Sequence, residues 1–182
     1  MAELVEHTLI RKCQNGDELA FAPLIAIYKD KLFSYLYRLC GNREEAEDLF
    51  QETLIKAWKG MKHLNDPNKF SSWLFSIAHN LAMDSLSKKK RNFAMSLTNH
   101  NNLLNPNNQF DDMIRNEEIL EIHKIVDGFP PKQKEVFLLR IFGEKKFKEI
   151  AEIVNEPLNT VLSHMHYSVE KIKNIMVKKN GK

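Results

Sequence analysis

The stretch from Phe147 to Tyr167 constrains the fold of this chain most strongly, because it predicts two short helices joined by a tight turn. In the first helix, the apolar residues that share one face are Phe147, Ile150, Ala151 and Val154. Asn155 readily adopts the left-handed backbone conformation, and Pro157 suits the first turn of a new helix. Ala151 is small enough to let the second helix cross closely. The stretch therefore predicts a helix-turn-helix.

The predicted second helix has an apolar side and a polar, uncharged side. The apolar side holds Leu158, Val161, Met165, Val169 and Ile172, and the outward side holds Asn159, Thr160, Ser163, His166 and Tyr167. When a helix-turn-helix binds DNA, its second helix lies in the major groove and contacts base edges. The order of small residue, turn and paired apolar stripes favours this interpretation over an ordinary helical hairpin within a core.

Composition indicates an all-α protein without a β-sheet. The 182 residues are 43% hydrophobic, include only six glycines and six prolines, and show no sustained alternating run. Cys13 and Cys40 form no C-x-x-C pair, and the first residues lack the apolar segment of a secretion signal. We therefore expect a reduced, cytoplasmic protein without membrane insertion. The net charge of +3 favours an anionic partner only mildly.

The helix predicted from Glu44 to Trp58 carries an unusual acidic face. Helices at 3–13, from 16 onward and at 30–40 precede it, and Asn42 with Glu45 forms a capping pair at its start. Its inward stripe is Ala46, Leu49, Phe50, Thr53 and Ala57, and its outward residues are Glu44, Asp48, Gln51, Glu52 and Ile55. An outward isoleucine among acids indicates a protein interface, and the alternative is a solvated acidic face.

A loop is predicted from Gly60 to Asn68, followed by a helix from Phe70 to Ser87. One side of this helix is polar and uncharged, and consists of Ser72, Ser76, His79, Met83 and Ser87, with Trp73 and Asn80 along its flank. Such a surface suits unpaired bases, and the basic residues Lys88 to Arg91 that follow would attract phosphates. A solvated helix end is the alternative interpretation.

Residues 92–112 lose helical periodicity and are rich in asparagine, so they predict a flexible linker. Helices at 117–127 and 131–142 then precede the helix-turn-helix. The predicted domains are therefore 1–91 and 113–182, joined by the linker 92–112.

Sequence blocks in both predicted domains resemble one family across nearly the whole chain. They are GDELAFAPLIAIY, NREEAEDLFQETLIKAW, FSSWLFSIAHNLAMDSL, FPPKQKEVFLLR and FKEIAEIVNEPLNTVLSHM. In order and spacing they resemble bacterial RNA polymerase sigma factors of the extracytoplasmic-function (ECF) group. The resemblance implies a transcription initiation factor that binds core RNA polymerase, directs it to promoter DNA and helps melt the minus-ten region. An anti-sigma factor is a further candidate partner.

The resemblance also implies three sites. The core-polymerase site would consist of Asp48, Gln51, Glu52 and Ile55. The minus-ten site would consist of His63, Asn65, Trp73, His79, Asn80, Asp84, Lys88, Lys89, Lys90 and Arg91. The minus-thirty-five site would consist of Lys146, Lys148, Asn159, Thr160, Ser163, His164, Tyr167 and Lys171.

The chain departs from the family pattern at several of these positions. Where the family usually has G-T-V-K-S-R, residues 159–164 read N-T-V-L-S-H, so two positive charges are absent. The usual arginine of the I-A-R-N block is His79, and the usual serine before the helix-turn-helix is Lys146. These departures predict that the recognition helix itself anchors weakly on duplex DNA.

No catalytic, metal or cofactor site is predicted. His164 and His166 are two residues apart on a helix and therefore do not face each other, and no nucleophile motif or phosphate-binding loop is present. Two rival functions remain. A dimeric helix-turn-helix regulator would bind palindromic duplex DNA without polymerase, and a helical adaptor would bind protein alone.

Overall fold

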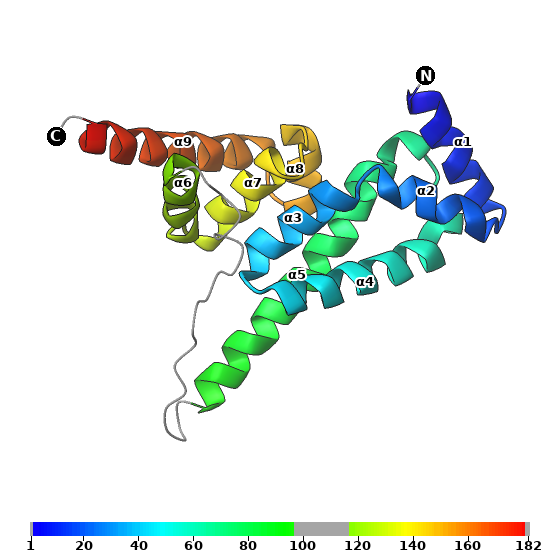
Figure 1. The fold of residues 1–182 in the computed structure, drawn as a ribbon, viewed down its shortest axis with the longest axis horizontal. Coiled ribbons are helices and arrows are strands. Elements are labelled where there is room, and N and C mark those ends of the chain that lie inside the picture. Colours follow the sequence, from blue (N-terminus) through cyan, green and yellow to red (C-terminus); the bar gives the residue numbers. More distant parts are fainter. Residues whose placement is uncertain (1, 97–116, 181–182) are drawn as a thin grey trace. The chain divides into compact units, whose positions relative to one another are not determined.

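A computed structural model describes the backbone of residues 2–96 and 117–180, and the side chains of residues 4–93 and 122–177. The described elements are all helical, and they form two compact units, residues 1–106 and 107–182 (Figure 1). The predicted all-α fold with two helical domains is confirmed. The exact domain boundaries stay a prediction, because residues 97–116 lie outside the described part of the chain. Among the described helices, none has the length and apolar character that a membrane span requires.

The core of the first unit is built by three helices: α3 (Lys29–Cys40), α4 (Arg43–Gly60) and α5 (Phe70–Ser96). Helices α1 (Ala2–Gln14) and α2 (Phe21–Ala26) pack at one end, with the short 3-10 turn η1 (Glu18–Ala20) between them. The largest fully buried side chains of this core are Ile10, Leu24, Leu32, Tyr35, Leu36, Met61, Phe70, Leu74 and Phe75.

Local signals define the junction between α3 and α4. Gly41 has φ 70°, and its N–H donates to the Tyr37 carbonyl at 2.8 Å, which ends α3. Asn42 then caps α4, because its side-chain oxygen accepts the Glu45 N–H at 2.9 Å. Thr53 is a fully buried polar residue of α4, and its hydroxyl donates to the Leu49 carbonyl at 2.7 Å. From this capped start, the side of α4 predicted to face inward packs on the core, and the side predicted to face outward is exposed.

The segment between α4 and α5 differs from the predicted loop. It contains two 3-10 turns, η2 (Met61–His63) and η3 (Pro67–Lys69), and buries Met61 and Leu64. The Gln14 side chain of α1 donates to the Leu64 carbonyl at 2.7 Å, which fixes the segment on the first unit.

Helix α5 also runs further than predicted, to Ser96 instead of Ser87. Residues 88–96 contain no glycine or proline, so nothing in the sequence ends the helix at the basic cluster. The first residues of the predicted linker, Asn92 to Ser96, are therefore helical, and its remainder lies outside the described residues.

The second unit consists of α6 (Glu117–Asp127), α7 (Pro131–Ile141), α8 (Phe147–Val154) and α9 (Leu158–Asn180). Helix α7 packs against both α8 and α9, and the buried side chains include Leu138, Leu139, Ile150 and Val161. Asn155 has φ 53° and ψ 50°, so it makes the left-handed turn that its sequence position predicts. The helix-turn-helix is therefore confirmed as α8, a tight turn and α9.

Candidate polymerase and promoter interfaces

The outward side of α4 presents an acidic surface with one apolar residue. Asp48, Gln51 and Glu52 are exposed, and Ile55 is 54% exposed on the same side. Glu52 makes a loose ion pair with Lys56 at 3.5 Å, in which both side chains are half exposed, so it stays accessible. The surface combines negative charge with an apolar contact, which suits a basic protein partner.

A polar groove of about 590 Å³ lies between α4 and α5, and part of the acidic surface forms one of its walls. Its acidic wall contains Glu44, Glu45, Asp48 and Glu52 of α4, and its other wall contains Leu81, Asp84, Ser85, Lys88 and Lys89 of α5. Glu45 bridges the walls: its carboxylate accepts the Ser85 hydroxyl at 2.7 Å and the Lys89 ammonium at 2.5 Å. The bridge fixes α5 against α4 at the start of the basic cluster.

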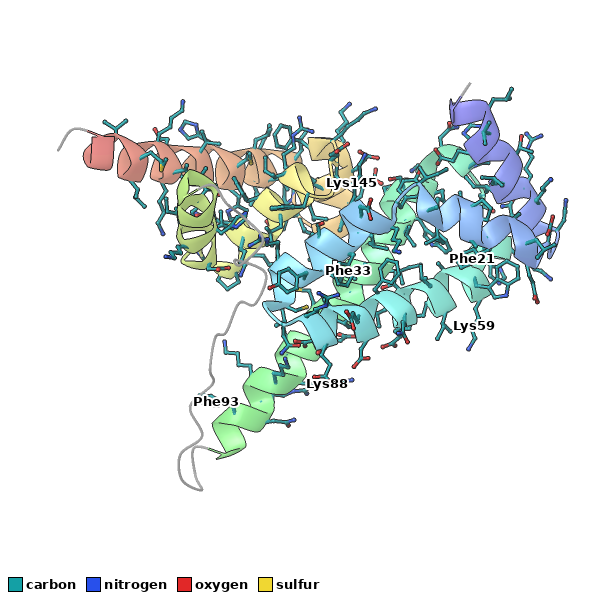
Figure 2. All side chains as sticks on the ribbon, viewed as in Figure 1. Phe21, Phe33, Lys59, Lys88, Phe93 and Lys145 are labelled. Carbon is teal, nitrogen blue, oxygen red and sulfur yellow. The ribbon has the colours of Figure 1, made fainter. Side chains whose placement is uncertain are left out.

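The exposed side of α5 passes from polar to basic residues along the helix. Asn80 and Asp84 are exposed, and Lys88, Lys89, Lys90 and Arg91 follow on the exposed second half, where Figure 2 labels Lys88 and Phe93. His63 and Asn65 are exposed just before the helix. The exposed surface therefore combines hydrogen-bonding groups with a cationic helix end.

Trp73 is held at the start of α5 by close packing. Its ring centroid lies 5.9 Å from that of Phe70, and a Cβ atom added at Gly60 would lie 2.9 Å from its Cζ2. The absence of a side chain at Gly60 thus leaves the space that the half-buried indole occupies.

The N-terminal part of α9 presents an uncharged surface. Asn159, Leu162, Ser163 and Tyr167 are exposed, and Thr160 is half-buried. The Ser163 hydroxyl donates to the Asn159 carbonyl at 2.9 Å, so it is engaged within the helix. Lys146 and Lys148, at the start of α8, are exposed, and the Lys146 N–H donates to the Glu149 carboxylate at 2.7 Å.

Each of the two units matches a known protein family. Sigma-70 region 2 matches residues 24–92, and Sigma-70 region 4 matches residues 119–172. The ECF RNA polymerase sigma factor SigW of Bacillus subtilis is 32% identical over 180 residues, which cover 94% of this chain and 96% of the relative. The chain belongs to the ECF group of RNA polymerase sigma factors. It is thus a transcription initiation factor, and the dimeric duplex-binding regulator is not favoured.

A second ECF sigma factor agrees with this assignment, and two solved structures share the fold. The ECF sigma-E factor of Haemophilus influenzae is 28% identical over 184 residues, with 96% of this chain and 97% of the relative covered. The fold resembles that of the sigma factor RpoE in complex with the anti-sigma factor NepR from Bartonella quintana, with a TM-score of 0.71, 19% identity, and 86% and 96% coverage. It also resembles CnrH in complex with the cytosolic domain of CnrY, with a TM-score of 0.69, 18% identity, and 96% and 98% coverage.

His79 of this sigma factor does not lie on an exposed face, so that prediction is wrong. It is 4% exposed, and its Nδ1 lies 2.8 Å from the Tyr35 hydroxyl oxygen in the core. Ser72, expected beside it, is also buried and donates to the Lys69 carbonyl at 3.1 Å. Their polar atoms find protein partners, so burial leaves neither unsatisfied.

Two residues predicted to contact duplex DNA in the sigma factor have partners within the second unit. His164 is half-buried, and its Nε2 lies 3.2 Å from a Glu156 carboxylate oxygen in the turn. Lys171 is exposed, but its ammonium donates to the Gly128 carbonyl at 3.0 Å and lies over the Phe129 ring. His164 therefore faces the turn rather than the outward side of α9.

Charged residues of α7 extend this contact and were missed by the sequence interpretation. Lys132 lies 3.2 Å from the Glu135 carboxylate and 3.6 Å from that of Glu156. Burial raises the pKa of Glu135, and the Lys132 charge offsets part of that shift. Lys132 and Glu135 are three residues apart on α7, but Glu156 joins them only when α7 packs on the turn, so sequence spacing gave no signal for the cluster as a whole. Within the described residues, no group of three or more His, Cys, Asp and Glu side chains could hold a metal ion.

Proposed function

We propose that this sigma factor recruits core RNA polymerase through the outward side of α4. The observation that carries the proposal is the exposed set of Asp48, Gln51, Glu52 and Ile55 on one side of a helix whose opposite side is buried. Their side chains are exposed and take no part in the core of the unit. Acidic groups around an apolar residue suit a basic protein surface.

The same unit would hold the melted minus-ten strand next to the polymerase. The proposed contacts are His63, Asn65, Trp73, Asn80, Asp84, Lys88, Lys89, Lys90 and Arg91, without the buried His79. Aromatic and amide groups suit unpaired bases, and the lysines and arginine suit the phosphates that follow. Glu45 joins this surface to α4 through Lys89, so in the wild-type chain Lys89 would contribute less to phosphate binding than the other three cations.

The second unit would bind the minus-thirty-five element as duplex DNA, with the N-terminus of α9 in the major groove. Asn159, Thr160, Ser163 and Tyr167 would lie toward the bases, while Lys146 and Lys148 would lie toward the backbone. His164 and Lys171, which are engaged within the unit, would contribute less than predicted.

This role requires no chemistry from the sigma factor, so we propose that it is not an enzyme and that phosphodiester formation belongs to the polymerase. It would act in the cytoplasm, on core polymerase and promoter DNA. An anti-sigma factor is a further proposed partner, because one structure with the same fold is a complex with an anti-sigma factor.

Transcription from a library of randomised promoters tests the proposal. Purified core polymerase would be assayed with and without the full chain, and the transcripts would be sequenced. We expect defined start sites on asymmetric promoters only when both proteins are present. Binding to palindromic duplex DNA without polymerase, or unchanged transcripts on addition of the chain, would contradict it.

A further inference from the structure

The N-terminal part of α9 lacks the side chains that most often read guanine. From Asn155 to Val169 the chain has no lysine or arginine, and these are the residues that commonly bond guanine O6 and N7. His164 is directed to Glu156 at 3.2 Å, and His166 lies 3.6 Å from the Glu170 carboxylate. The positively charged contacts typical of guanine recognition are therefore missing from this stretch.

An amide and an apolar side chain occupy the same part of the surface. Asn159 is exposed in the first turn of α9, and Leu162, three residues later, is 41% exposed. Residues three apart on a helix are neighbours, so both can reach adjacent base pairs. The neighbouring Ser163 hydroxyl donates within the helix and Thr160 is half-buried, which leaves the Asn159 amide as the exposed side chain of this turn that can both donate and accept.

The chemistry of these two side chains matches an A·T pair in the major groove. An asparagine amide can bond adenine N6 and N7 together, and an apolar side chain packs against the thymine methyl group. We propose that Asn159 and Leu162 make this helix-turn-helix specific for A·T pairs in the minus-thirty-five element. Asn159 bonds adenine, and Leu162 covers a thymine methyl. This inference rests on the proposed function, because it requires the N-terminus of α9 to lie in the major groove.

Base analogues test the inference directly. Holoenzyme made from the full chain and core polymerase would first select binding sites from promoters with a randomised minus-thirty-five element. Its affinity would then be measured on selected sites that carry one analogue at a time. Uracil in place of thymine removes only the methyl group, 7-deazaadenine removes the adenine N7 acceptor, and 7-deazaguanine does the same for guanine.

We expect selected sites to contain A·T pairs at the positions that α9 reads. One uracil should weaken binding about fourfold, as loss of one buried methyl group predicts. One 7-deazaadenine should weaken binding about fivefold or more. The 7-deazaguanine substitutions should have no effect.

Variants of exposed residues assign the contacts. Leu162→Ala should abolish the uracil effect, and Asn159→Ala should abolish the 7-deazaadenine effect. Val177→Ala and Asn174→Ala are matched controls on exposed positions further along α9, and they should keep both effects.

The outcomes separate this inference from the proposed function. If holoenzyme selects no minus-thirty-five sequence, the proposed function itself fails. If it selects a sequence but tolerates uracil and 7-deazaadenine, or responds instead to 7-deazaguanine, the assignment of Asn159 and Leu162 is overturned.

Discussion

The Glu45 carboxylate on α4 and the Lys89 ammonium on α5 lie 2.5 Å apart. The Glu45 side chain is 12% exposed and the Lys89 side chain 57%, so the carboxylate is fixed in the interface while the lysine reaches it from solvent. The contact joins the helix proposed to bind polymerase to the helix proposed to bind the melted strand. Because Lys89 is paired with Glu45, one of the four positive side chains from Lys88 to Arg91 is already engaged within the unit.

Glu45→Gln should release Lys89 for phosphate binding. Each additional phosphate contact on single-stranded DNA adds about 0.7 to the slope of log affinity against log salt concentration. We expect holoenzyme with this substitution to show a slope steeper by about that amount on a minus-ten single strand. Glu47→Gln, which removes an exposed ion pair with Arg43 on the same helix, should leave the slope unchanged. Equal slopes for wild type and Glu45→Gln would show that Lys89 already binds phosphate.

Gly60→Ala should displace the Trp73 indole, because the new Cβ would lie 2.9 Å from Cζ2. Overpacking of this kind costs about 1 to 3 kcal/mol, of which the better helix propensity of alanine offsets up to about 1 kcal/mol. Tryptophan emission in a Trp58→Phe background, together with urea unfolding, measures both effects. Gly128→Ala is the control, since the nearest atom to its added Cβ lies at an ordinary 3.5 Å. Unchanged emission and stability in Gly60→Ala would refute the predicted clash.

Glu135 should make stability fall as pH rises through a defined window. Burial raises the pKa of Glu135 in the folded chain above its unfolded value. Between the two values the folded chain binds more protons than the unfolded chain, so unfolding becomes easier with increasing pH. Glu135→Gln should flatten this decline in urea unfolding above the ordinary titration range of glutamate. Glu152→Gln, at an exposed position of α8, should keep the wild-type decline. Parallel pH profiles for wild type and Glu135→Gln would count against the assignment.

Leu162→Lys should supply one of the positive charges that the recognition helix lacks. A lysine side chain is longer than leucine and should extend past the base edge to a neighbouring phosphate, so the slope of log affinity against log salt concentration on minus-thirty-five duplex should steepen by about 0.9. Adding His164→Arg should change the slope little further, because that side chain faces the Glu156 carboxylate. A salt series measured by fluorescence anisotropy checks both steps. A slope that increases only with His164→Arg would contradict the placement of these two residues.

The parts of the fold that the sequence predicted depend on neighbours along the chain. Gly41 and Asn42 at the α3–α4 junction, and Asn155 in the helix-turn-helix, act through local backbone conformation and capping. The outward side of α4 likewise followed from helical periodicity.

What periodicity could not predict are contacts between residues of different elements. His79, expected on an exposed face, is buried, and its Nδ1 lies 2.8 Å from the Tyr35 hydroxyl oxygen of another helix. His164 lies 3.2 Å from the Glu156 carboxylate, which the turn positions beside α9, and its contact with duplex DNA stays a prediction. Neither partner can be chosen from periodicity alone. The end of α5 at Ser96 was missed because charge and asparagine content, rather than a helix-breaking residue, marked the predicted linker.

The affinity of the full chain for core RNA polymerase, measured with the outward side of α4 reversed in charge, tests the central claim most directly. Asp48→Lys with Glu52→Lys should weaken binding by roughly a hundredfold or more, because like charges across an interface cost several kcal/mol. Glu18→Lys with Asp30→Lys makes the same change in net charge at exposed positions elsewhere in the unit and should bind as wild type does. Circular dichroism should show the same helicity in all three proteins. Wild-type affinity in the Asp48→Lys, Glu52→Lys chain would contradict the account.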